Sequence, residues 1–529
     1  MKLIKNSGLV IFLLGLAIFT STLFLGDFQL TDNIFKNAVS AQEYNNLHTQ
    51  FEQEIYGKTY ATSYAFSADA IKIYTATNNS FKVNEAWDKV MWTKPSSFAL
   101  TLSKASSTGY LSNNKWMFFF LTFGLGIIGS LMFILPNIIL LGAAGIKNDG
   151  IYHDAATNRG WVGILAFGFL FFFYILLYFY PYIIVNWTNI VDLVKHLFNP
   201  KEGASQWFLY GLLYCTSMII MGVRMFIKYR HNNYQMVRTA SVLFFQIVFA
   251  FLLVEILPLF GLPGKDLKNA WPLDYYFLYD WNVQQLMDSG HFGKFLFVWG
   301  MLFSIVIIPV MVYFYGKRWY CSWVCGCGGL AETIGDPYRQ LSSKTLLSWK
   351  LERWILYPVL GFAVVTTVWT GYHTYNVFNN PDMDSKEILL GFSAFDIRDW
   401  YGFLIGSIFA GVIGTGFYPL LGNRTWCRFG CPLAAYMGII QRFKSRFRIT
   451  TNGGQCISCG NCSTYCEQGI DVRAYAQKGQ NIVRASCVGC GVCSAVCPRG
   501  VLKLENAPEE GRVNHDPILI GKEKIELNK

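Results

Sequence analysis

Long apolar runs alternate with short polar segments over most of the chain. The first run, 9–26, follows Lys2 and Lys5 and is long for the apolar part of a signal peptide, so we expect a retained membrane helix. Seven further runs are each close to the ~20 residues that a helix needs to cross the hydrocarbon. They cover 116–145, 161–187, 207–228, 237–260, 295–316, 354–372 and 401–421. The pattern predicts a mostly α-helical, polytopic membrane bundle of about eight transmembrane helices.

The polar segments divide this bundle into parts. Residues 29–115 are polar and mixed in charge, which indicates an exported segment or a small domain. We expect a first membrane helix over 1–28, a four-helix membrane part over 116–260 and a second membrane part over 261–448. A cysteine-rich domain follows at 449–505, and 506–529 has the composition of a flexible tail.

Charge supports the membrane assignment and orients it. Charged residues make up 15% of the chain, against about 25% in an ordinary soluble domain. The net charge of +11 comes largely from short loops, which indicates anionic lipid and membrane topology rather than nucleic acid. An inside N-terminus places most loop bases on one face, namely Lys147, Arg159, Arg224, Lys228, Arg230, Arg238, Lys317, Arg318, Arg339, Lys344, Lys350 and Arg353. The opposite loops carry the acids Asp274, Asp280, Asp382, Asp384, Glu387 and Asp399. Both termini are therefore predicted to be cytoplasmic, in a bacterial cytoplasmic (inner) membrane.

Two cysteine runs near the C-terminus carry the clearest chemistry. The run Cys-x-x-Cys-x-x-Cys-x-x-x-Cys occurs twice, as Cys456, Cys459, Cys462 and Cys466, and as Cys487, Cys490, Cys493 and Cys497, the second followed by Pro498. This is the spacing of bacterial two-cluster ferredoxins, in which the fourth cysteine of each run ligates the other cluster. We therefore expect two [4Fe-4S] clusters in an α+β ferredoxin-like domain, one held by Cys456, Cys459, Cys462 and Cys497, the other by Cys487, Cys490, Cys493 and Cys466. Two structural zinc sites are the alternative, although zinc does not require this tandem spacing.

A second set of cysteines follows two of the apolar runs. Cys321 and Cys325 come after the sixth run, and Cys427 and Cys431 after the eighth, each pair in the order helix, basic and aromatic residues, Cys-x-x-x-Cys. The two copies form an internal repeat on one membrane face. On a helix, cysteines four apart share a face, so the two pairs together offer four thiolates. A third metal centre, most naturally iron–sulfur, is one interpretation, with Cys327 as a spare ligand. A redox-active dithiol, a copper(I) site and buried free thiols are the others.

With these motifs, the chain resembles the membrane-bound 4Fe-4S polyferredoxins of the NapH, NosR and CcoG type over about 316–505. The resemblance implies electron transfer between the membrane or exported side and cytoplasmic clusters. Three features depart from the family pattern. Gly326 and Cys327 stand where the family has proline, the exported segment lacks a flavin-attachment signature, and the simpler members have no counterpart of the N-terminal helices.

Two charged residues lie within the apolar runs. Glu255 is an acid in the fifth run and is a candidate proton acceptor near a quinol, or else a solvated residue near the interface. Arg224 lies near the cytoplasmic boundary, where its side chain is expected to reach the headgroups.

These observations predict a membrane-bound iron–sulfur protein that passes electrons between the quinone pool or another membrane partner and cytoplasmic clusters. It would act as the electron-transfer subunit of an oxidoreductase, with redox partner proteins in a membrane complex. Two alternatives are an assembly or maturation factor that reduces a metal or thiol of a client enzyme, and a structural or sensory iron–sulfur subunit.

Overall fold

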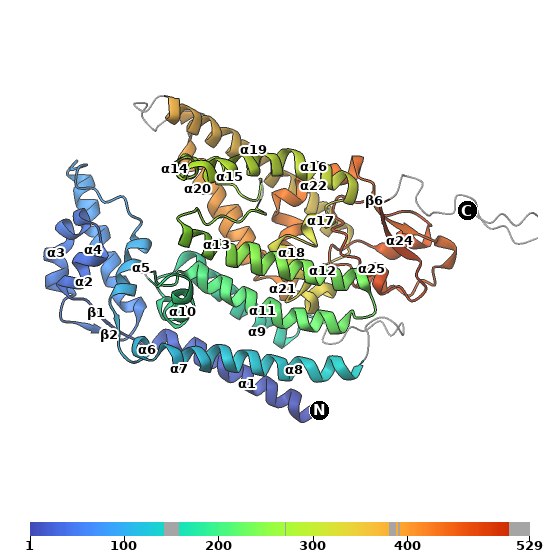
Figure 1. The fold of residues 1–529 in the computed structure, drawn as a ribbon, viewed down its shortest axis with the longest axis horizontal. Coiled ribbons are helices and arrows are strands. Elements are labelled where there is room, and N and C mark those ends of the chain that lie inside the picture. The colour runs from blue at the N-terminus through green and yellow to red at the C-terminus, as the bar shows by residue number, and fades with distance from the viewer. Residues whose placement is uncertain (142–157, 201, 270, 380–387, 390–391, 507–529) are drawn as a thin grey trace, which may run out of the picture. The chain divides into compact units, whose positions relative to one another are not determined.

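The computed structural model describes residues 1–141, 158–200, 202–269, 271–379, 388–389 and 392–506 (Figure 1). Residues 507–529 of the predicted tail, Lys147, and the loop acids Asp382, Asp384 and Glu387 lie outside the described residues. The chain divides into two compact units, one formed by Met1–Asn137 and Phe172–Thr216, the other by Ile138–Phe171 and Ser217–Lys529.

The first unit combines membrane-length helices with a small domain. Helix α1 (Lys2–Ser21) leads through η1 (Thr22–Phe24) into a three-stranded antiparallel sheet of order β2-β1-β3, with β1 at Asp27–Gln29, β2 at Thr59–Tyr60 and β3 at Ser107–Thr108. Four helices accompany it, α2 (Asp32–Ala38), α3 (Ala41–Glu54), α4 (Ser63–Val83) and α5 (Pro95–Ala105). Phe35, Phe51 and Phe66 are fully buried in its core. The polar segment is therefore a packed domain rather than an extended loop.

The next helices return the chain to apolar sequence, and three of them cross the boundaries between the two units, at 137/138, 171/172 and 216/217. They are α6 (Tyr110–Asn113), α7 (Lys115–Phe119), the π-helical η2 (Phe120–Gly124), α8 (Leu125–Leu141), α9 (Trp161–Phe179), α10 (Val185–Phe198) and α11 (Gln206–Lys228). The expected run 161–187 ends early, because Phe179 closes α9 and Trp187 belongs to the separate helix α10.

The second unit continues with apolar helices that carry the chain back and forth. Its helical segments are α12 (Asn233–Phe244), η3 (Phe245–Leu252), α13 (Leu253–Ile256), η4 (Leu257–Phe260), α14 (Asp280–Asp288), α15 (Gly290–Leu302), η5 (Phe303–Ile307), α16 (Ile308–Tyr315), α17 (Arg318–Cys321), α18 (Gly326–Glu332), η6 (Asp336–Leu341) and α19 (Leu346–Asn379). Beyond the hairpin β4 (Ile388–Leu389) and β5 (Phe392–Ser393), α20 (Ala394–Tyr401), η7 (Gly402–Ile413), α21 (Tyr418–Leu421), η8 (Trp426–Gly430) and α22 (Pro432–Lys444) return along α19.

Seven helices in the described residues are long and apolar enough to cross a membrane. In the most apolar 18-residue stretch of each helix, only 17% to 28% of the stretch is buried inside the protein. Apolar side chains such as Leu347, Trp354 and Val368 therefore face outward. Such an apolar exterior requires lipid as its solvent, and the protein is a polytopic membrane protein.

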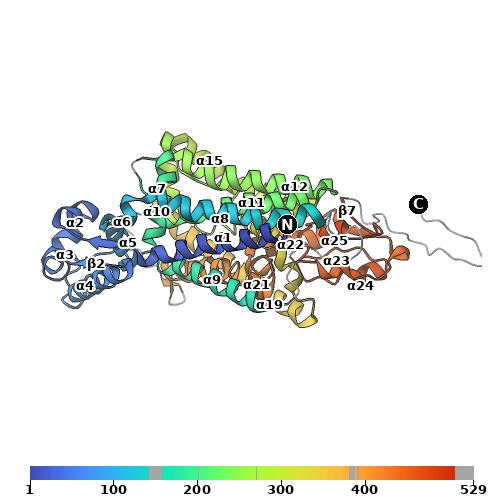
Figure 2. The ribbon, with the colours of Figure 1, turned by 90° about the horizontal axis from the view of Figure 1, so that it is seen from below.

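The eighth expected run, 401–421, does not form one long helix. It continues α20 as the π-helical η7 and then turns at 414–417 before α21 begins. Gly416 lies so close to the preceding turn that an added Cβ would stand 2.2 Å from the Val412 carbonyl oxygen. The helix prediction is wrong at this point. The chain still returns to the first turns of α19, where Arg428 of the later segment pairs with Glu352 at 2.9 Å, and α22 packs against α19 (Figure 2).

The cysteine-rich domain closes the second unit. Strand β6 (Phe447–Thr451) pairs antiparallel with β7 (Leu502–Asn506), and η9 (Gly453–Gln455) with three short helices, α23 (Asn461–Thr464), α24 (Val472–Gln477) and α25 (Val492–Ala495), lies between them. This is the α+β domain that the sequence predicts.

Candidate functional site

The two ferredoxin-type runs have the same backbone path. Residues with a left-handed backbone conformation occur at the same three distances from the first cysteine of each run. They are Ser458 and Gly489, Gly460 and Gly491, and Gly469 and Gly500. A left-handed residue between two cysteines turns the chain sharply, so that successive thiols point toward one volume. Ser458 adopts this conformation without being glycine, which is uncommon and costs conformational energy.

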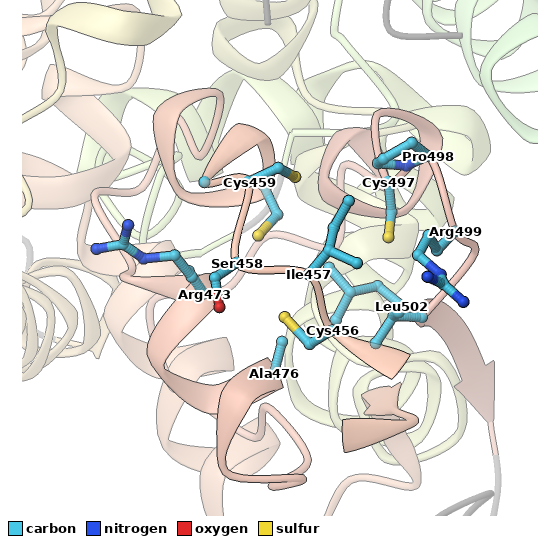
Figure 3. A pocket seen from close by; sticks show the side chains of 13 residues that line it. Cys456, Ile457, Ser458, Cys459, Arg473, Ala476, Cys497, Pro498, Arg499 and Leu502 are labelled. Atoms are coloured by element: carbon cyan, nitrogen blue, oxygen red, sulfur yellow. The ribbon is translucent and has the colours of Figure 1, made fainter. Parts of the chain in front are cut away.

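The first expected ligand set lines a single hollow. Cys456, Cys459 and Cys462 come from the first run and Cys497 from the second, and Figure 3 shows the sulfur atoms of Cys456, Cys459 and Cys497 around the same space. Cys459 is exposed, and Cys456 and Cys497 are half-buried. The structure thus brings together the four thiols that the cross-run spacing predicts, at an accessible edge of the domain.

The second expected set lies deeper. Burial raises the pKa of Cys493, and the neighbouring Cys490, Cys487 and Cys466 raise it further. Thiols crowded in this way retain their protons until a metal displaces them, which is the chemistry of a thiolate metal site.

The membrane motifs repeat a local fold. Gly316 after α16 has φ 67° and ψ 178°, and Gly422 after α21 has φ 96° and ψ 167°, a region open essentially to glycine alone. In both copies a short helical segment follows and carries the first cysteine, and the second cysteine caps the next helix. Cys325 caps α18, and Cys431 caps α22, where its Sγ accepts from the Ala434 amide at 3.4 Å.

All four motif thiols meet in one buried cluster. Cys321, Cys325, Cys427 and Cys431 are between 4% and 8% exposed and share a core. Burial raises the pKa of Cys431, as do the neighbouring Cys427, Cys325 and Cys321. The pairs converge as expected, but not for the expected reason, because the two cysteines of each motif lie on successive segments rather than on one helix.

Cys327 lies beside this group. The Cys327 thiol donates a hydrogen bond toward Cys325 and lowers the pKa of that thiol to about 6, while burial acts in the opposite direction. The bend that brings Cys321 back to α18 also requires glycine, because a Cβ on Gly328 would stand 1.9 Å from the Cys321 carbonyl oxygen.

The sulfurs of these sets are spaced more widely than the ligands of one zinc ion. Tetrahedral zinc with Zn–S bonds of about 2.3 Å needs sulfurs roughly 3.8 Å apart. Across the described residues, no three cysteine sulfurs lie within 4.8 Å of one another. An all-thiolate donor set with wider spacing fits a larger iron–sulfur cluster.

A buried ionic network joins the two cysteine regions, and sequence reasoning missed it. Its members are at most 3% exposed, and they are Arg224, Lys228, Arg238, Glu332, Asp336, Arg339, Arg424 and Glu467. Five bases face three acids, so the network carries a net positive charge. Buried charges are costly unless paired, and these are paired throughout.

Arg424 links the membrane motifs to the ferredoxin domain. Its Nη1 lies 3.2 Å from the Cys321 carbonyl oxygen and 3.8 Å from Cys427 Sγ, while Nη2 contacts Glu332 at 2.6 Å and Glu467 at 3.0 Å. Glu467 directly follows Cys466 in the sequence. One side chain therefore touches both the membrane motif and the segment that carries the second set.

Glu467 is held as a carboxylate. Burial raises the pKa of Glu467, but the guanidinium groups of Arg339 and Arg424 outweigh it and lower the pKa to about 2. Arg339 donates to Glu467 at 2.6 Å and to Asp336 at 2.9 Å, and it also pairs with Glu332.

The helices before the motifs complete the network. Arg224 and Lys228 pair with Asp336 at 2.5 Å and 2.6 Å. The expectation that Arg224 reaches the headgroups is wrong, because its charge is neutralised inside the protein. Arg238 pairs with Glu332 at 2.7 Å and donates to the Cys490 carbonyl oxygen at 2.5 Å.

Further hydrogen bonds attach the second set to the membrane part. Ser322, next to Cys321, donates to the Val488 carbonyl oxygen at 2.7 Å, and Tyr234 donates to Gly489 at 2.8 Å. Gln441 on α22 donates to the Cys487 carbonyl oxygen at 2.8 Å. The loop of the second set is thus held from three elements.

The structure leaves Glu255 apart from these groups. It lies on α13, 17 residues beyond Arg238, which at 1.5 Å per residue is about 26 Å along the helix.

Comparisons with known proteins agree with this geometry. A family model described as a 4Fe-4S dicluster domain matches residues 448–498, and a 4Fe-4S binding domain model matches twice, at 297–351 and 402–450. The double match covers both copies of the membrane motif. Over this region the chain is similar to the NapH-like polyferredoxins. Iron–sulfur clusters of ferredoxin-type domains are held by cysteine thiolates.

The curated relatives share only part of their length with the chain. The putative electron transport protein YccM of Escherichia coli is 27% identical over 32% of this chain and 46% of its own length. The methylamine utilization ferredoxin-type protein MauN of Methylobacillus flagellatus is 26% identical over 32% of the chain and 54% of its length. The ferredoxin-type protein NapH of Escherichia coli is 25% identical over 38% of the chain and 64% of its length. No solved structure gives a significant match.

Proposed function

We propose that this protein is a membrane-bound iron–sulfur electron-transfer protein with three centres in sequence. The first would be held by Cys321, Cys325, Cys427 and Cys431, with Cys327 beside it. The second would be held by Cys466, Cys487, Cys490 and Cys493, and the third by Cys456, Cys459, Cys462 and Cys497. When bound, such clusters supply one-electron transfer.

The contacts of Arg424 carry the proposal. A single buried guanidinium touches Cys427 Sγ and the carboxylate of Glu467, the residue after Cys466. Ser322 adds a second connection, from the residue after Cys321 to the loop of Cys487 and Cys490. Rigid, dry contacts of this kind hold two redox centres at a fixed separation and keep water from reorganising around the charge.

The buried network also supports a role in setting potential. The carboxylates of Glu332 and Glu467 lie beside Cys490, with Arg238 and Arg339 behind them, so charges of both signs act on the potential of a cluster in the second set. The cysteines that line the hollow are the most exposed of the three sets. Electrons would therefore enter or leave the protein at that site.

We further propose that both termini face the cytoplasm of a bacterial cell, with the quinone pool as a donor or acceptor at the other end. The loop bases named above support this orientation. A protein that matures a client enzyme would use the same centres, so the proposal needs a functional test.

Electron transfer can be tested with the purified protein in lipid nanodiscs. Anaerobic addition of a short-chain quinol should change the cluster absorbance and EPR signals reversibly. Absence of any exchange with quinol or quinone, together with loss of a client enzyme's metal site on gene deletion, would favour the maturation role.

A further inference from the structure

The rim of the exposed hollow is positively charged. Arg473 on α24 and Arg499 after Cys497 line the hollow and lie on opposite sides of the labelled cysteines (Figure 3). Both are exposed, and neither forms an ion pair with any residue that the structure describes. No acid is among the described residues that line the hollow.

Two further bases lie on the adjoining elements. Lys478 follows α24 and Lys503 lies on β7, and both are exposed. Two acids lie near these bases in the sequence, Asp471, which accepts from Ser463 Oγ at 2.7 Å, and Glu505, which accepts from Thr450 Oγ1 at 2.8 Å. The four bases outnumber these two acids, which leaves a net positive charge at this edge.

Apolar surface accompanies the charge. Ile457, between Cys456 and Ser458, is 49% exposed, and Pro498 lines the same hollow. A small apolar centre with a charged rim is typical of transient protein interfaces, where charge guides encounter and complex lifetime stays short.

We propose that this rim, formed by Arg473 and Arg499 with Lys478 and Lys503 on the adjoining elements, docks an acidic, soluble one-electron carrier protein. This inference rests on the proposed function, and it names the partner class for the exposed site. One electron passes in each encounter, lost by one protein and gained by the other, with no other reactant. Anionic lipid headgroups are the competing source of negative charge.

Binding provides the test, separately from activity. The full-length protein in neutral-lipid nanodiscs is titrated with an acidic plant-type [2Fe–2S] ferredoxin, and with a basic cytochrome c as opposite-charge probe. Double reversal, Arg473→Glu with Arg499→Glu, should weaken ferredoxin binding ~10- to 100-fold at ~50 mM salt. The difference should shrink to less than ~3-fold at ~0.5 M salt, where screening is short-ranged. Single changes to Gln should give intermediate losses.

Lys444→Glu is the matched control, because Lys444 is exposed at the end of α22 and does not line the hollow. It should change affinity less than ~2-fold. Equal affinity for the double variant and the unchanged protein, or an equal loss with Lys444→Glu, would overturn the proposal. So would loss of ferredoxin binding in anionic nanodiscs, since lipid would then occupy the rim.

A failure of electron transfer can be distinguished from a failure of docking. Ferredoxin that binds with the expected salt dependence but exchanges no electron with dithionite-reduced protein would contradict electron transfer and leave the docking surface standing. Unchanged EPR spectra of the double variant show that its clusters are intact.

Discussion

Replacing Glu467 with glutamine should raise the midpoint potential of the second centre. One carboxylate oxygen of Glu467, one of Glu332 and Cys490 Sγ lie within 4.8 Å of one another. At that distance and an effective dielectric constant near 20, two unit charges interact by about 3.5 kcal/mol. This corresponds to about 150 mV for one electron, at about 1.4 kcal/mol per 59 mV.

The true shift will be smaller, because the charge of a cluster is spread beyond one sulfur. We expect a rise of roughly 50 to 150 mV for Glu467→Gln and a similar rise for Glu332→Gln. The rise follows because the removed negative charge opposed the extra electron. Redox titration followed by EPR, on protein in nanodiscs, measures it.

Asp336→Asn is the matched control. It removes one buried carboxylate from the same network, but Asp336 is not in the group around Cys490. All three variants should lose stability by about 3–5 kcal/mol, since each leaves buried bases underpaired. Only the first two should move the potential strongly. A shift below ~20 mV for Glu467→Gln, a fall in potential, or an equal shift for Asp336→Asn would refute the reasoning.

Two further predictions address other parts of the second unit. Burial raises the pKa of Asp274 to about 6; the charge of Lys265 opposes this shift and that of Asp266 adds to it. The protonated acid therefore favours the folded state. This contribution to stability is lost as the pH rises from about 3.8 to about 6. Asp274→Asn should therefore stabilise the protein by at most about 3 kcal/mol at pH 8 and by almost nothing at pH 3.5, as judged by unfolding curves in detergent; equal effects at both pH values would contradict this. Gly328→Ala should abolish the centre at the membrane motifs and leave the ferredoxin-type EPR signals, because its Cβ would meet the Cys321 carbonyl oxygen at 1.9 Å. Gly454→Ala, with open space around its Cβ, should keep every signal.

The sequence predicted the features whose causes are local. Ligand spacing within each ferredoxin-type run is a local property, so the cross-run grouping of Cys497 with Cys456 could be read from spacing and is what the structure displays. Apolar length likewise predicts membrane helices. Where small residues such as Gly416 allow a tight turn, length alone misplaces the helix end.

The ionic network could not be predicted, because its partners are distant in the chain. Arg339 and Glu467 are 128 residues apart and touch only after the helices and the ferredoxin domain have packed. One feature of the sequence could have indicated the network. Glu332, Arg424 and Glu467 each lie within seven residues of an expected ligand cysteine, where a charge in an apolar setting requires a partner.

Iron content, combined with EPR, tests the central claim of three centres most directly. The account predicts about twelve irons per chain in the unchanged protein. The double variant Cys427→Ser with Cys431→Ser should contain about eight, with one signal lost and the two ferredoxin-type signals retained. About eight irons in the unchanged protein, or a full set of signals in the variant, would contradict it.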